Sequence, residues 1–137
     1  MLTLEDVKNK VYEMGELVGL DKDSSLYPLF SKTPNVFSDG NSIYIDREYH
    51  YIIMERGSIN KHYQSEKLED ILCRVFCNIT FTLAKDYELN NRRENEDFRR
   101  QLWSKQLELL GKINVSFQKN RSEEIDKILA ISPFTDE

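Results

Sequence analysis

Residues 36–57 read VFSDGNSIYIDREYHYIIMERG, and this stretch carries the strongest β-sheet signal in the chain. Asp39-Gly40 lies between two short apolar runs, 36–37 and 43–45, which is the pattern of a β-hairpin turn. Residues 46–48 predict a second turn, and residues 49–55 follow as a third strand that Arg56-Gly57 ends. We therefore predict a three-stranded antiparallel meander. A sheet this small is stable only if helices cover one of its faces.

One helix is predicted before this sheet. Thr3 can cap its first turn, Asp6 favours the same end through the helix dipole, and Gly19 is a natural stop. Residues 20–35 contain prolines and serines and read as a loop. Apolar side chains are expected to pin this loop to the core, namely Leu26, Tyr27, Leu29 and Phe30.

Three helices are predicted after the sheet. Ser65 can cap the first, which runs to Tyr87 with the cleanest apolar periodicity in the chain. The second begins near Asp97 and the third is capped by Asn114, and Pro133 begins a short tail. The expected fold class is α+β: an N-terminal helix, a three-stranded antiparallel meander and three C-terminal helices packed on the sheet. Residues 1–137 are expected to form a single domain.

The charge of the chain bounds its partners. It has 19 Lys and Arg against 24 Asp and Glu, a net charge of −5. Residues 1–60 contain six basic and ten acidic residues, and residues 61–137 contain thirteen and fourteen. An acidic chain without a basic stripe is a poor binder of nucleic acid, but it suits a basic protein that docks on the first half. The alternative is that the acidity only keeps the protein soluble.

The predicted compartment is the cytoplasm. The first ten residues, MLTLEDVKNK, mix charged and apolar residues, unlike a signal peptide. No apolar run approaches the ~18 residues of a membrane span. Cys73 and Cys77 lie four residues apart in a predicted helix, a spacing that rarely meets disulfide geometry, and reduced thiols suit the cytoplasm. We therefore expect contact with neither nucleic acid nor a membrane.

Side chains that could support catalysis or hold a metal are few. His50, His62, Cys73 and Cys77 are the soft metal ligands, and Cys-x3-Cys lacks the spacing of most zinc sites. Both cysteines lie in mid-helix, away from the helix N-terminus that activates a thiol. We therefore expect no catalytic residue, no metal and no cofactor. A hydrolase that uses His50 with Glu55 or a cysteine is a weak alternative.

Two groups of side chains each allow a structural and a functional interpretation. Charged residues near the ends of predicted elements are expected to form an ion-pair network that fixes how the meander docks on the helices, and the alternative is a charged functional site. This network would comprise Glu55, Arg56, Glu88, Arg92 and Arg99. Three tyrosines, Tyr44, Tyr49 and Tyr51, form either a binding face or the packed side of the sheet, and the sequence favours neither.

Four pieces of sequence follow one another in a characteristic order: 49–57 (YHYIIMERG), 86–89 (DYEL), 97–100 (DFRR) and 106–113 (QLELLGKI). Together they resemble the bacterial immunity proteins called immunity protein 63. The likeness covers roughly residues 43–130. Its motifs are expected to maintain the fold, so Glu55-Arg56-Gly57 is not carried over as a contact site.

The resemblance implies a role in a toxin–immunity pair. Such a protein sits in the cytosol of the producing cell and blocks a cognate toxin C-terminal domain by occlusion. The toxin is often a polymorphic domain delivered by contact-dependent growth inhibition. Many such toxins are basic nucleases, with which an acidic partner is compatible. The alternative is a non-catalytic adaptor or regulatory module, and for either role the oligomeric state stays open, with a monomer as the simplest case.

Exposed acids of the first half are the predicted toxin contacts, with two tyrosines as aromatic anchors. These residues are Asp21, Asp23, Asp39, Asp46, Glu48, Tyr44 and Tyr49. The alternative for each is ordinary solvated surface. We expect that reversing the charges of Asp46 and Glu48 together weakens toxin binding without lowering the melting temperature.

Overall fold

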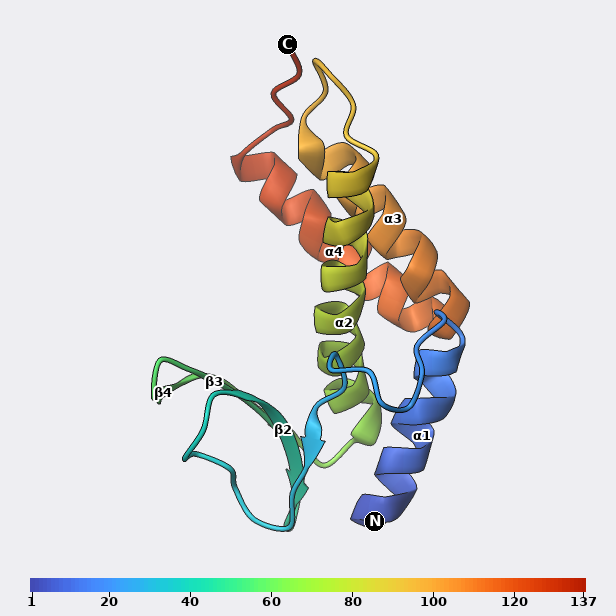
Figure 1. The fold of residues 1–137 in the computed structure, drawn as a ribbon. Helices are drawn as coiled ribbons and strands as arrows, with labels where there is room; N and C mark the ends of the chain where they lie inside the picture. The colour runs from blue at the N-terminus through green and yellow to red at the C-terminus, as the bar shows by residue number, and fades with distance from the viewer. The chain divides into compact units, whose positions relative to one another are not determined.

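The computed structural model describes residues 1–137, which divide into two compact units, 1–75 and 76–137. The first, here called the β unit, contains α1 (Leu4–Glu16), a sheet and the start of α2 (Leu68–Asn90). The second, here called the helical unit, contains the rest of α2, α3 (Phe98–Ile113) and α4 (Val115–Ile131) (Figure 1). The predicted α+β class and the order of its helices are confirmed. A single domain over residues 1–137 and the docking of helices on the sheet stay predictions.

The first helix begins at its predicted cap. The Thr3 hydroxyl accepts the N–H of Asp6 at 3.1 Å, and the Asp6 carboxylate accepts the N–H of Thr3 at 3.2 Å. This reciprocal capping box fixes the first turn of α1. Gly19 has a φ of +85°, the left-handed conformation expected where the chain leaves a helix. The following loop is pinned as predicted, because the Tyr27 ring meets the Tyr12 ring edge-on at 4.9 Å.

The sheet has four strands in the order β1-β2-β3-β4, so the prediction of three strands is wrong. The strands are β1 (Leu29–Phe30), β2 (Gly40–Ile45), β3 (Tyr49–Glu55) and β4 (Ser58–Ser65). β1 pairs with β2 in parallel, and the other two pairs are antiparallel. The predicted strand at 36–37 is not formed, and Gly40 opens β2 instead of turning a hairpin.

The unpredicted hairpin is turned by Arg56-Gly57. Both residues have positive φ, +52° and +78°, which is the geometry of the tightest hairpin turns. An arginine seldom adopts positive φ, and β4 reads SINKHYQS, with few apolar residues to mark a strand. Asp39 supports this turn, because its carboxylate accepts the N–H of Arg56 at 3.1 Å and the N–H of Gly57 at 3.0 Å.

The two faces of the sheet have different partners within the β unit. One face carries an apolar cluster of Tyr44, Ile52 and Met54. On the opposite face, the Tyr49 hydroxyl accepts the N–H of Leu2 at 2.9 Å, which ties the segment before α1 to β3. Tyr51 stacks on Tyr63 of β4 on the same face, with ring centroids 6.1 Å apart. Alternation along β3 therefore separates two packed surfaces.

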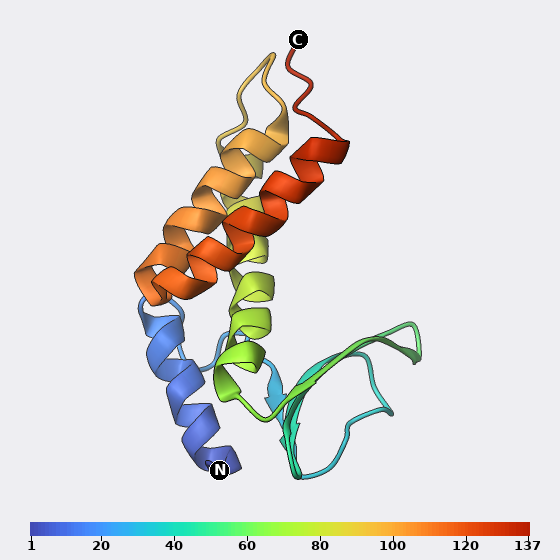
Figure 2. The ribbon, with the colours of Figure 1, turned by 180° about the vertical axis from the view of Figure 1, so that it is seen from behind.

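The helical unit is held by an apolar core and one buried amide. The core contains Ala84, Leu102, Trp103 and Ile125. Asn114 caps α4 as predicted, and α3 begins next to Asp97 as predicted, with Asp97 as its cap. Helices α3 and α4 lie side by side (Figure 2). Gln106 of α3 is 1% exposed, and its Nε2 donates to the Cys77 carbonyl of α2 at 2.9 Å while its Oε1 accepts from Arg121 Nε of α4 at 3.0 Å. This one side chain therefore links three helices.

Candidate functional site

The acids predicted to contact a partner do not form one patch. Asp46 and Glu48 share the β2–β3 turn at one end of the sheet, whereas Asp39 precedes β2 at the other end. Because β2 has six residues, these ends lie about 20 Å apart. Asp21 and Asp23 are exposed in the loop after α1. The structure therefore brings Asp46 and Glu48 together as one acidic turn and leaves Asp39 apart, engaged with the β3–β4 turn.

Asp46 has a structural task within this acidic turn. Its Oδ1 accepts the N–H of Glu48 at 2.9 Å and lies 2.7 Å from Nε2 of His50. The backbone bond from Glu48 and the bond to His50 lower the pKa of Asp46. Reversing the charge of Asp46 would remove both bonds. We therefore expect this change to lower the melting temperature as well as any toxin affinity, unlike the prediction made from the sequence. The carboxylate of Glu48 makes neither bond and is the better probe of charge.

His50 is the centre of a hydrogen-bonded chain on one face of the sheet. Its ring is 5% exposed and stacks on Tyr44 at 4.2 Å between centroids. Its Nδ1 lies 2.9 Å from Nε2 of His62 on β4, and its Nε2 contacts Asp46. Burial, and next the neighbouring His50, lower the pKa of His62, so His62 is neutral at pH 7. The sequence missed this pair because it becomes visible only when β4 and its register are known.

This geometry argues against the hydrolase alternative. Both ring nitrogens of His50 are engaged by Asp46 and His62 rather than by Glu55 or a thiol. Cys73 and Cys77 are half-buried thiols on α2. Over residues 1–137, no group of three or more His, Cys, Asp or Glu side chains is arranged to hold a metal ion.

The two tyrosines proposed as anchors are packed, with Tyr44 7% exposed and Tyr49 5% exposed. Of the two interpretations left open by the sequence, the packed side of the sheet is the one seen, because Tyr44 stacks on His50 and Tyr49 holds Leu2. A different aromatic is available to a partner: Phe37 is 93% exposed. The sequence predicts a strand at Phe37, because this residue follows the apolar Val36, and therefore does not identify it as a surface residue.

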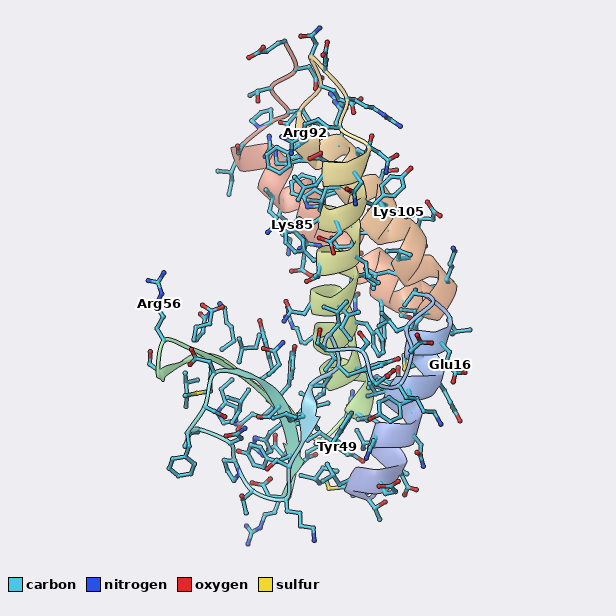
Figure 3. All side chains as sticks on the ribbon, in the orientation of Figure 1. Glu16, Tyr49, Arg56, Lys85, Arg92 and Lys105 are labelled. Carbon is cyan, nitrogen blue, oxygen red and sulfur yellow. The ribbon has the colours of Figure 1, made fainter.

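The predicted charge network is formed only in part. Glu55 and Arg56 are exposed at the β3–β4 turn and make no ion pair, because the turn lifts both side chains into solvent. Figure 3 shows Arg56 at the tip of the hairpin, pointing away from the sheet. Within the helical unit, Glu88 is 2% exposed and accepts from Arg92 through both oxygens, at 2.6 and 3.1 Å. These bonds raise the pKa of Arg92.

The start of α3 binds the C-terminal residues. Asp97 accepts from Arg99 at 2.8 Å and from the N–H of Thr135 at 3.0 Å. Arg100 pairs with Asp136 at 2.9 Å and lies 4.0 Å from the centroid of the Phe134 ring. The bonds from Arg99, and next the bond from Thr135, hold the pKa of Asp97 well below its usual range. The sequence predicted only a short tail at residues 133–137. In the structure, Arg99, Arg100 and the helix cap Asp97 bind these residues.

A polar cleft of about 420 Å³ lies beside this tail, within the helical unit. Its lining includes Glu88, Arg92, Arg93, Asp97, Gln101 and Thr135. Gln101 is 6% exposed, and its Oε1 has no hydrogen-bond partner. Charges of both signs line the cleft, and most are already paired with each other.

The fold and surfaces are those of a small α+β protein with an acidic turn and an exposed aromatic side chain. None of its helices combines the length and apolar character that crossing a membrane requires. The chain belongs to the immunity protein 63 family, whose model matches residues 46–127, more than half of the chain. No curated protein and no solved structure shows significant similarity to it.

Proposed function

We propose that this protein neutralises a cognate polymorphic toxin domain, of the kind delivered by contact-dependent growth inhibition, by binding and occluding it in the cytoplasm. Membership of the immunity protein 63 family is the observation that carries the proposal. Immunity protein families are in general non-catalytic, and the engagement of both His50 nitrogens fits a protein that acts by contact. No cofactor or nucleic acid takes part in the proposed role.

The proposed toxin is a nuclease with a basic surface. Charge is unequal between the units: the β unit has nine Lys and Arg against thirteen Asp and Glu, whereas the helical unit has ten against eleven. The β unit therefore carries a net charge of −4 and the helical unit −1. A basic toxin would be steered toward the β unit by this difference, and its association would slow as salt rises.

The contacts proposed within the β unit are the acidic turn, with Asp46 and Glu48, and the loop acids Asp21 and Asp23. Phe37 is added because an exposed aromatic ring supplies contact area at little entropic cost. Tyr44 and Tyr49 are no longer proposed, since both rings are packed. Asp39 is also set aside, because its carboxylate is bonded to the β3–β4 turn.

The test of the proposal is co-expression with the toxin domain encoded immediately upstream of this gene. A stable one-to-one complex and restored growth of toxin-expressing cells are expected. A toxin that kills equally with and without this protein, and that does not co-purify with it, would refute the proposal and favour an adaptor with an unrelated partner. Protection should persist in a folded His50→Gln, Cys73→Ser, Cys77→Ser variant, because binding needs none of these groups as a catalyst.

A charge reversal tests where the toxin docks. Glu48→Lys should slow association with the toxin about tenfold at low salt, as expected for a charge close to the interface. Glu123→Lys on α4 is the matched control, because it makes the same change of net charge in the helical unit. Association rates are measured by stopped flow. If they fall equally in both variants, the net charge of the protein explains the change, and the acidic turn is not the docking site.

A further inference from the structure

One edge of the sheet is left open and regular from Lys61 to Ser65, after a single bulge at Asn60. β4 has eight residues and only one neighbouring strand, β3. Six of its residues are exposed and two are half-buried, and β4 contains no proline. No backbone group of residues 59–64 bonds to any loop or side chain. Strand edges of this length are usually shortened, covered or interrupted, because their unpaired N–H and C=O groups invite another strand.

The opposite edge of the same sheet is closed in these usual ways. β1 has only two residues there, Leu29 and Phe30, and it pairs in parallel with β2. The chain then leaves the sheet after Ser31, whose N–H donates to the Ile43 carbonyl at 2.9 Å. The two edges are therefore built differently: a short strand blunts one, and the five residues 61–65 run without interruption along the other.

The register identifies which groups of β4 face outward. The Ile43 carbonyl points to β1, so the pair Ile43–Tyr51 exchanges no bonds between β2 and β3. Tyr51 must then direct its N–H and C=O toward its β4 partner, Tyr63. Because successive residues of a strand alternate, the N–H and C=O of His62 and Gln64 point away from the sheet. These are two donors and two acceptors arranged to continue a ladder.

Charges near this edge indicate what could pair with it. Tyr49 pairs with Ser65, so the acidic turn at Asp46 and Glu48 lies at the same end of the sheet as Gln64. The middle of β4 carries Lys61, and residues 58–65 include no acid. A second copy of this chain that paired antiparallel about Lys61 would bring the two Lys61 side chains directly opposite each other, and like charges in that position oppose this self-pairing.

We propose that an extended segment of the toxin adds to the β4 edge as a fifth strand, with a basic residue near the acidic turn and an acidic residue opposite Lys61. This inference rests on the proposed function and names the surface that performs it. Main-chain bonds from His62 and Gln64 supply part of the affinity, and the flanking charges select the register. The toxin is then bound by the backbone of β4, which no side-chain motif in the sequence identifies.

Residue-resolved hydrogen exchange of the full-length protein, free and with the upstream-encoded toxin domain, tests the inference. The amides of His62 and Gln64 should exchange rapidly in the free protein and at least tenfold more slowly in the complex. The amide of Tyr63 is bonded to β3 in both states and serves as the internal control. A complex that leaves His62 and Gln64 unprotected would overturn the inference while sustaining the proposed function, whereas the absence of any complex would overturn the proposed function.

Two variants at one position supply an independent test. Gln64→Pro removes an outward N–H and no bond of the β3–β4 ladder, so the protein should fold while its dissociation constant for the toxin rises at least tenfold. Gln64→Ala keeps the N–H and should bind within about twofold of wild type. Equal affinity of the two folded variants would overturn the inference. If Gln64→Pro does not fold, Lys61→Glu replaces it, and unchanged affinity of that variant would count against the charge pairing.

Discussion

Gln106→Met should lower the stability of the helical unit, because it removes hydrogen bonds while nearly preserving the side chain's volume. The amide of Gln106 reaches the Cys77 carbonyl at 2.9 Å, the Thr80 hydroxyl at 3.4 Å and Arg121 Nε at 3.0 Å. Gln106 is 1% exposed, so water cannot readily replace these partners. Thr80 keeps its bond to the Phe76 carbonyl, at 2.6 Å, and loses little.

The size of the effect follows from these three contacts. A neutral hydrogen bond such as the one to Cys77 contributes about 1 kcal/mol, and one to a charged donor such as Arg121 contributes about 1.5–3 kcal/mol. The long contact to Thr80 adds little, and the methionine side chain returns about 0.5–1 kcal/mol through its apolar burial. The net loss of unfolding free energy should therefore be about 2–3 kcal/mol.

Urea unfolding followed by the fluorescence of Trp103 measures this loss. Trp103 is the only tryptophan and is 7% exposed in the helical unit, so its emission reports on that unit. At a slope of about 1.5–2 kcal/mol/M, the midpoint should fall by about 1–2 M. Lys112→Met, on the same helix, alters only an exposed pair with Glu108 and should change stability by less than about 0.5 kcal/mol. A loss below about 1 kcal/mol in Gln106→Met would refute the role assigned to the amide.

Three further changes test other parts of the fold. Gly15→Ala should destabilise by about 1–3 kcal/mol in thermal unfolding, because its Cβ collides with the Tyr27 hydroxyl, whereas Gly111→Ala meets only the end of the Gln118 side chain and should cost at most about 1 kcal/mol, the bond that this amide donates to the Leu107 carbonyl. The pKa of Asp97 is lowered by folding, so its contribution is fully present above about pH 4, shrinks as pH falls below that, and disappears only below the lowered folded-state pKa; NMR should show the C-terminal residues still bound at pH 3, and their detachment at that pH from a folded helical unit would contradict this. Asp39→Ala should speed amide exchange at the β3–β4 turn with about 1 kcal/mol or less of global loss, and unchanged exchange would contradict its role there.

The helices could be predicted because their determinants are local. Thr3, Asp97 and Asn114 cap helices within two or three residues of their own position, which a sequence displays directly. The helical spacing of apolar residues after Ser65 likewise predicted α2. Strands β2 and β3 were recognised by the same means, from turn residues and alternation.

The parts that escaped prediction depend on distant partners. β4 is polar because much of it faces solvent at an edge, so no alternation marks it, and its turn places a non-glycine residue at positive φ. Asp39 was interpreted as a turn residue, whereas its carboxylate bonds a turn 17 residues away. The His50–His62 contact also spans 12 residues and follows from the register of β4. These three errors share one source, the unpredicted strand β4.

A binding surface made of backbone groups explains why the recognisable motifs and the proposed contact differ. Every residue except proline has an N–H and a C=O, so the edge at His62 and Gln64 places no strict requirement on their side chains. Discrimination between toxins would then come from charges beside the edge, above all the acidic turn and Lys61. Steering by these charges should weaken with salt, whereas strand pairing should not. A complex whose association slows in salt while its dissociation stays constant would display both contributions separately.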